Sequence, residues 1–221
     1  ELLKQACVFI EEFISTGQNI LFVATKKSSQ EIIREAAISC GMSFVASRWL
    51  GGALTNFATI ANSIQKYKKY LEMETDGRLD KLPNKEASAI RLEMKRMFRN
   101  FEGIVEMDKL PDALFVIDSK YEQIAVAEAR RLNIPIVALV DTNADPSQVD
   151  YAIPGNNDSS KSIRLIVEII TEAVQKGLAQ RKRKDELQKT PGVGIKEQQT
   201  KEEQLPVTAS RKSSVSEKEI I

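Results

Sequence analysis

The chain has 221 residues, of which 42% are hydrophobic and 29% charged, with a formal net charge of +1. This composition supports a folded core, and the near balance of charge argues against a strongly basic nucleic-acid binder. The absence of His excludes His-based triads and most zinc sites. No apolar run reaches the roughly 18 residues of a membrane span, and no basic-then-apolar start resembles a signal peptide.

The first part of the chain alternates between helical and strand patterns. Apolar residues recur at helical spacing over 2–13, and residues 19–24 then read as a buried strand. Ser28 and Glu31 predict a capping box for the next helix, which leads to a second strand at 43–46. A strand, a helix and a second strand predict one right-handed crossover unit of a parallel sheet.

Between Arg48 and Leu110 this rhythm is interrupted by two segments with heptad spacing. The apolar residues with this spacing are Phe57, Ile60, Ile64, Tyr67 and Leu71, then Ala87, Ile90, Met94, Met97 and Phe101. A polar turn at 75–80 separates the segments, and Pro83 is placed to start the second helix. The pattern predicts an antiparallel coiled-coil hairpin, inserted in an α/β domain at about 55–103.

The α/β pattern then resumes and closes the domain. Residues 113–117 and 134–140 are predicted strands, and the second is apolar enough to be buried on both faces. A helix over 124–132 lies between them, and 162–178 predicts the closing helix. We therefore expect an α/β globular domain over 1–178. The charged residues 179–221 should be disordered, and those from Arg181 onward dispensable for folding.

Acidic residues follow the predicted strands at the edge where open α/β proteins bind ligands: Asp118, Asp141, Asp145 and Asp150. Such a cluster could hold Mg²⁺ for a phosphohydrolase. That chemistry would want a second carboxylate at position 143, which is Asn143. Turn capping is the favoured interpretation of these residues. Two isolated cysteines, Cys7 and Cys40, add no metal motif, so we predict no catalytic residue, metal or cofactor.

Two basic regions are candidate RNA-binding sites. Arg48 and Trp49 open a loop in which the indole could stack on a base; alternatively, Trp49 anchors the root of the hairpin. In either case Thr55 or Asn56 can cap the outgoing helix. With Phe57 and Ala87 at heptad position a, basic residues occupy outward positions of the hairpin: Lys66, Lys69, Lys85, Lys95, Arg96 and Arg99. These cations could bind phosphates, or simply form a solvated face.

Three motifs in order resemble one protein family. They are Arg48-Trp49-Leu50-Gly51-Gly52-Ala53-Leu54-Thr55-Asn56, Leu110-Pro111-Asp112-Ala113-Leu114-Phe115-Val116-Ile117-Asp118, and Val140-Asp141-Thr142-Asn143 continuing through Asp145-Pro146 and Val149-Asp150 to Ile153-Pro154-Gly155-Asn156. Over roughly residues 1–178 the chain resembles the bacterial-type ribosomal protein S-two family. The resemblance implies a flavodoxin-like, three-layer parallel sheet with the coiled-coil hairpin as the family's insertion.

The same resemblance implies a structural, non-enzymatic protein of the small ribosomal subunit in the cytoplasm. Its partners would be the RNA of that subunit and neighbouring ribosomal proteins, including the largest one, with no membrane and no small-molecule substrate. The basic segment that usually opens this family is missing from the sequence, so any RNA contact made by it is expected outside this chain. The alternatives are an α/β Mg-dependent phosphohydrolase and a coiled-coil adaptor without RNA contact.

Overall fold

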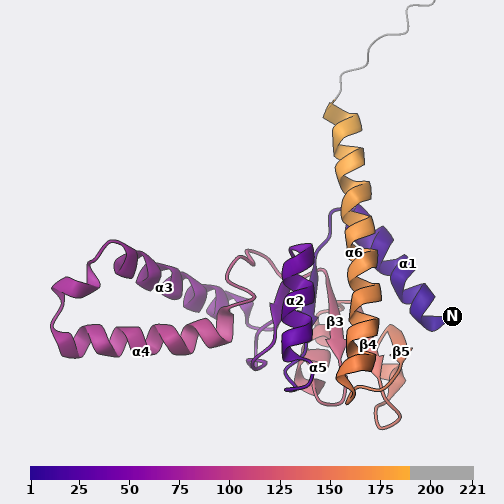
Figure 1. Ribbon diagram of the computed structural model, residues 1–221, viewed down its shortest axis with the longest axis horizontal. Coiled ribbons are helices and arrows are strands. Elements are labelled where there is room, and N and C mark those ends of the chain that lie inside the picture. The colour runs from indigo at the N-terminus through magenta and orange to yellow at the C-terminus, as the bar shows by residue number, and fades with distance from the viewer. Residues whose placement is uncertain (190–221) are drawn as a thin grey trace, which may run out of the picture.

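The structure, a computed structural model, describes residues 1–189; the predicted tail beyond Lys189 lies outside the described residues. Figure 1 shows a compact α/β body from which two long helices project. The elements in chain order are α1 Leu2–Ser15, β1 Ile20–Val23, α2 Gln30–Cys40, β2 Ser43–Val45, α3 Phe57–Thr75, η1 Leu79–Lys81, α4 Asn84–Phe101, β3 Ala113–Ile117, α5 Gln123–Arg131, β4 Ile136–Val140, η2 Pro146–Gln148, β5 Tyr151–Pro154 and α6 Ser160–Lys189.

The five strands form one parallel sheet in the order β2-β1-β3-β4-β5. This is the strand order of flavodoxin-like proteins, and the predicted α/β class with a parallel sheet is confirmed. The three central strands are buried along their whole length, which explains why their sequences are almost continuously apolar.

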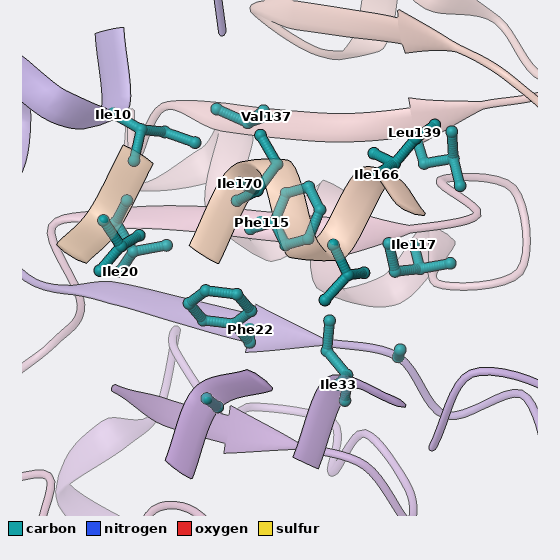
Figure 2. Packing of buried hydrophobic residues seen from close by; sticks show 14 of the residues in the cluster. Ile10, Ile20, Phe22, Ile33, Phe115, Ile117, Val137, Leu139, Ile166 and Ile170 are labelled. Atoms are coloured by element: carbon teal, nitrogen blue, oxygen red, sulfur yellow. The ribbon is translucent and has the colours of Figure 1, made fainter. Parts of the chain in front are cut away.

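Alternate residues of the central strands face two separate hydrophobic cores, as the two-residue period of a strand requires. Phe22 and Phe115 face α1, α2 and α6, and their rings meet edge to face with centroids 5.4 Å apart (Figure 2). Leu114 and Val116 face the opposite core, which contains residues of α5, α3 and α4. The body is therefore three layers deep, and its second core is continuous with the packing of the two projecting helices.

Helix α6 crosses α1 very closely at Gly177. A Cβ atom at this position would lie 2.7 Å from the carbonyl oxygen of Glu11 and 2.8 Å from Cβ of Ile14. The helix continues past Leu178 to Lys189, although its sequence had been expected to become disordered there. Polar contacts with α1 accompany this extension: the Gln180 amide donates to the Glu11 carboxylate, and Lys184 Nζ lies 3.3 Å from Ser15 Oγ.

Strand β5 was not predicted, because its short sequence buries only Ile153 fully. It pairs with β4, with Val137 opposite Tyr151 and Leu139 opposite Ile153. Asp150, just before the strand, accepts a hydrogen bond from the Ile136 amide at 2.8 Å. The segment is thus an edge strand whose position is set largely by backbone and carboxylate bonds.

The predicted capping box at the start of α2 was wrong. Ser29 occupies the N-cap position and makes no side-chain capping hydrogen bond; its hydroxyl donates back to the Lys26 carbonyl instead. Glu31 forms an ion pair with Arg34 at 3.2 Å. Side-chain bonds inside the turn and along the helix replaced the reciprocal cap.

Helices α3 and α4 lie side by side as a projecting arm, residues 57–101, joined at the far end through η1 (Figure 1). The arm returns to the body at Gly103, whose carbonyl accepts a hydrogen bond from the Phe44 amide at 2.9 Å. A Cβ at Gly103 would come within 2.1 Å of the Phe44 carbonyl oxygen, so only glycine permits this approach. No helix in residues 1–189 is long and apolar enough to cross a membrane.

Candidate functional site

The loop that leads from β2 into the arm is held by one carboxylate, that of Glu128 in α5. Glu128 Oε1 accepts hydrogen bonds from the Trp49 indole at 3.1 Å and the Gly52 amide at 2.8 Å. Its Oε2 accepts from the Leu54 amide at 3.0 Å and from both the amide and hydroxyl of Thr55 at 3.1 Å. Gly52 has a φ of 85°, which few other residues adopt at low cost. We call this arrangement the root loop, residues 48–56.

The environment of Glu128 favours its ionised form. Burial opposes ionisation, but hydrogen bonds from Thr55, Trp49, Leu54 and Gly52 outweigh it and lower the pKa of the Glu128 carboxyl group. An ionised carboxylate accepting several donors is a strong, geometrically specific anchor. The negative charge that holds the arm's root therefore comes from the body of the protein.

Trp49 is only 8% exposed, and its indole N–H is already bonded to Glu128. This geometry fits the anchoring interpretation and offers no free ring face for a base to stack on. Arg48, the preceding residue, is exposed. Asn56 sits at the N-cap of α3 but makes no side-chain capping bond, whereas Thr55 bonds to Glu128, so neither residue makes the predicted side-chain cap.

The basic residues predicted on the arm are all exposed, but they differ in their partners. Lys66 forms an ion pair with Glu93 at 2.6 Å and lies 5.3 Å from the ring centre of Tyr70. The charge of Lys66 is therefore largely neutralised by Glu93 within the arm. The remaining predicted cations form no ion pair with any residue the structure describes: Lys69, Lys85, Lys95, Arg96 and Arg99, together with Arg48 of the root loop.

Two of these free cations line a hollow where the arm meets the body. The hollow has a volume of about 420 Å³, and its lining consists of Gln30, Arg34, Ser47, Lys95, Phe98, Arg99 and Glu102. Sequence reasoning missed Arg34 and Phe98. Phe98 directly follows Met97 of the predicted apolar seam, and its position outside that seam was the available signal that its ring would be exposed.

The four acidic residues considered for Mg²⁺ each bond to a nearby group. Asp141 accepts from the Thr142 amide at 2.7 Å, Asp145 from the Ser147 amide at 2.9 Å, and Asp150 from the Ile136 amide. Asp118 accepts from the Tyr121 amide at 3.0 Å. Asp118, Asp141 and Asp145 thus have turn-capping roles, whereas Asp150 holds the start of β5 against β4. Over residues 1–189, no three His, Cys, Asp or Glu side chains come together as metal ligands would.

At the carboxyl ends of β1 and β3, the usual ligand position in this strand order, side chains of the protein pair with one another. Lys26 bridges Asp118, at 3.4 Å, and Asp158. Glu122 accepts from the Thr25 amide at 2.6 Å and the Thr25 hydroxyl at 2.7 Å. Burial raises the pKa of the Glu122 carboxyl group, although the bonds from Thr25 oppose this. These ion pairs and hydrogen bonds join the segments that follow β1 and β3.

The protein is thus an α/β scaffold with a flavodoxin-like sheet, and its projecting arm presents exposed cations to partners. The sequence matches the family model described as ribosomal protein S2, the S-two family of the resemblance above, over residues 1–177. The chain belongs to the ribosomal protein S2 family.

Two curated relatives carry the name small ribosomal subunit protein uS2. The chain is 56% identical to the protein from Opitutus terrae over 179 residues, covering 81% of this chain and 59% of that protein. It is 48% identical to the protein from Koribacter versatilis over 177 residues, covering 80% of this chain and 59% of that protein. The chain thus spans about 59% of the length of each of these relatives.

Proposed function

We propose that this protein is a structural, non-enzymatic constituent of the small ribosomal subunit, acting at the ribosome in the cytoplasm. It binds the RNA of that subunit and neighbouring ribosomal proteins, including the largest one. Membership of the S2 family and the names of its relatives support this role. The observation that carries the RNA-binding part is the set of exposed cations on the arm without an ion-pair partner in residues 1–189.

We propose further that the arm is an antiparallel coiled coil inserted at about 55–103 in an α/β domain formed by the rest of 1–178. Three of the α3 residues at the predicted seam, Ile60, Ile64 and Tyr67, are buried. On α4 the buried seam residues are Ala87, Met94, Met97 and Phe101. This spacing alternates between three and four residues on α3, as knobs-into-holes packing requires.

The seam leaves the charged side chains of the arm on its outer faces. Four exposed cations on these faces neutralise phosphates: Lys69, Lys95, Arg96 and Arg99. Arg48 adds a fifth cation at the root loop. Contacts of this kind position a protein on RNA without reading base sequence. Lys66 contributes less, because leaving Glu93 for a phosphate would exchange one ion pair for another.

The test is association with purified small subunits that lack this protein, measured by co-sedimentation over a series of salt concentrations. The variant reverses three free cations at once, Lys69→Glu, Arg96→Glu and Arg99→Glu. We expect weaker association, and a salt dependence reduced by about 0.9 log units per lost phosphate contact, the value for duplex DNA. Helicity and melting should be nearly unchanged, since these side chains are exposed.

The matched control reverses three exposed lysines of α1 and α6 on the body: Lys4→Glu, Lys161→Glu and Lys176→Glu. It changes net charge equally but leaves the arm intact, so its binding should exceed that of the arm variant. Equal binding and an unchanged salt slope for the arm variant would contradict the proposal. The arm would then be better described as a docking surface for another protein, the adaptor alternative.

A further inference from the structure

The hollow at the junction of arm and body combines three features that an unpaired nucleotide requires. Its walls come from α2, from the segment after β2, and from the last two turns of α4 with Glu102 that follows them. Its volume of about 420 Å³ falls within the range of about 300–1,000 Å³ for sites that hold small molecules. It therefore has room for a small ligand.

The charges around the hollow favour an anion. Lys95 and Arg99 form no ion pair within residues 1–189. Arg34 uses its two terminal nitrogens on Glu31, at 3.2 Å, and Glu102, at 3.0 Å. Its Nε is buried and has no hydrogen-bond partner. The lining thus holds two uncommitted cations and an unsatisfied guanidinium donor against the single carboxylate of Glu102.

An aromatic ring completes the set. Phe98 lines the hollow and is 49% exposed, whereas the seam residues before and after it on α4, Met97 and Phe101, are buried. Exposed aromatic rings beside cations are the usual platform for unpaired bases, because the ring stacks on the base while the cations hold the phosphate.

We propose that this hollow binds one unpaired nucleotide of RNA, with its base on Phe98 and its phosphate on Lys95 and Arg99. The inference rests on the proposed RNA-binding function and specifies which RNA feature the junction takes. The cations of the arm that lie away from the hollow, Lys69 and Arg96, bind any helix backbone, whereas the hollow selects a site at which a base is extruded from the helix.

The experiment compares two RNA probes that differ by one nucleotide: a duplex of about 12 base pairs and the same duplex with a single bulged adenosine. The full chain should bind the bulged duplex about tenfold more tightly, a difference typical of stacking one base on an aromatic ring. Phe98→Ala should abolish this preference and leave affinity for the perfect duplex unchanged. Phe98→Trp should retain it, and its fluorescence should be quenched by the bulged probe only, since the native Trp49 is buried.

Leu92→Ala is the matched control, because Leu92 is a 53% exposed apolar residue of the same helix that does not line the hollow. It should keep the full preference for the bulge. Lys95→Gln combined with Arg99→Gln should weaken binding of both probes.

Equal affinity of the full chain for the two probes, or a preference that survives Phe98→Ala, would overturn the assignment. Binding of hexaglutamate that depends on Phe98, without discrimination between the duplexes, would also overturn it in favour of an acidic protein segment. If the full chain shows no preference for the bulge but still sediments with small subunits, only the nucleotide site is refuted. If the full chain prefers the bulge but does not sediment with small subunits, only the proposed function is refuted.

Discussion

The indole of Trp49 and the carboxylate of Glu128 meet across 3.1 Å although 79 residues separate them in the sequence. This bond joins the start of the arm to α5, on the far side of the arm's insertion. The same carboxylate also fixes the amides of Gly52, Leu54 and Thr55. The direction in which the arm leaves the body is therefore set by a residue that lies outside both the arm and the loop.

Glu128→Gln should destabilise the protein by about 3 kcal/mol, because an amide offers one acceptor oxygen and turns a donor toward donors. Chemical denaturation at pH 7 measures this change. Gln123→Ala, an exposed change on the same helix, should stay within about 0.5 kcal/mol. The pKa of Glu128 is lowered in the folded protein, so its contribution is present above the ordinary value of 4.5 and is lost as the pH falls through the lowered pKa. The loss of stability caused by Glu128→Gln should therefore become smaller in acid, where the native carboxylate is itself protonated.

Trp49→Phe separates the two interpretations of the indole. The change keeps an aromatic ring in the core and removes one hydrogen bond, so it should cost about 1 kcal/mol of stability. Binding of RNA should remain unchanged, since the ring is buried. A loss of RNA affinity larger than the loss of stability explains would support a direct contact between the ring and a base.

The Glu122→Gln variant should differ in stability from the native protein by an amount that depends on pH. The pKa of Glu122 in the folded protein is raised above its ordinary value of 4.5 by burial. Its carboxyl group therefore favours the folded state below that pH, and this contribution is lost as the pH rises through the raised pKa. The melting temperature of the variant relative to the native protein should increase from pH 4 to pH 7. A constant difference across this range would contradict the assignment.

The strand and helix positions that carry the body were predictable because each has a strong local signal. The run from Ile136 to Val140 is buried on both faces and has almost no polar residue. Strand β5 had no such signal, because its pairing depends on β4 and on the carboxylate of Asp150. The exposed positions of the arm's cations were predictable from the heptad spacing. The role of Glu128 was not predictable, because only the folded chain brings Glu128 to the root loop.

Gly177→Ala tests the close crossing of α1 and α6. In an exposed helix this change would stabilise by about 1 kcal/mol, but here the added methyl group would overlap the Glu11 carbonyl. We expect a net destabilisation of about 1–3 kcal/mol, typical of overpacking. Ala179→Gly, an exposed position on the same helix, should cost only the helix-propensity difference of about 1 kcal/mol. Stabilisation by Gly177→Ala would show that the helices can separate without cost.

Ending the chain after Leu178 should lower its stability relative to a chain that ends after Lys189. The shorter form loses the contacts of Gln180 with Glu11 and of Lys184 with Ser15, a loss of about 1 kcal/mol. Thermal melting of the two forms measures the difference. Identical melting would restore the original expectation that the ordered core ends near Leu178.

The placement of the arm has a consequence for the rate at which the protein folds. The central pairing of the sheet joins β1 to β3, with Ile20 opposite Ala113, and the whole arm lies in the loop that this pairing closes. Contacts between residues so distant in sequence form slowly, because closing a long flexible loop costs chain entropy. Helices α3 and α4 are joined by a short connection and can pair early, which brings the two ends of the loop together before the strands meet. We therefore expect early pairing of α3 with α4 to shorten the search for the native sheet, so that the arm would act as an internal clamp during folding.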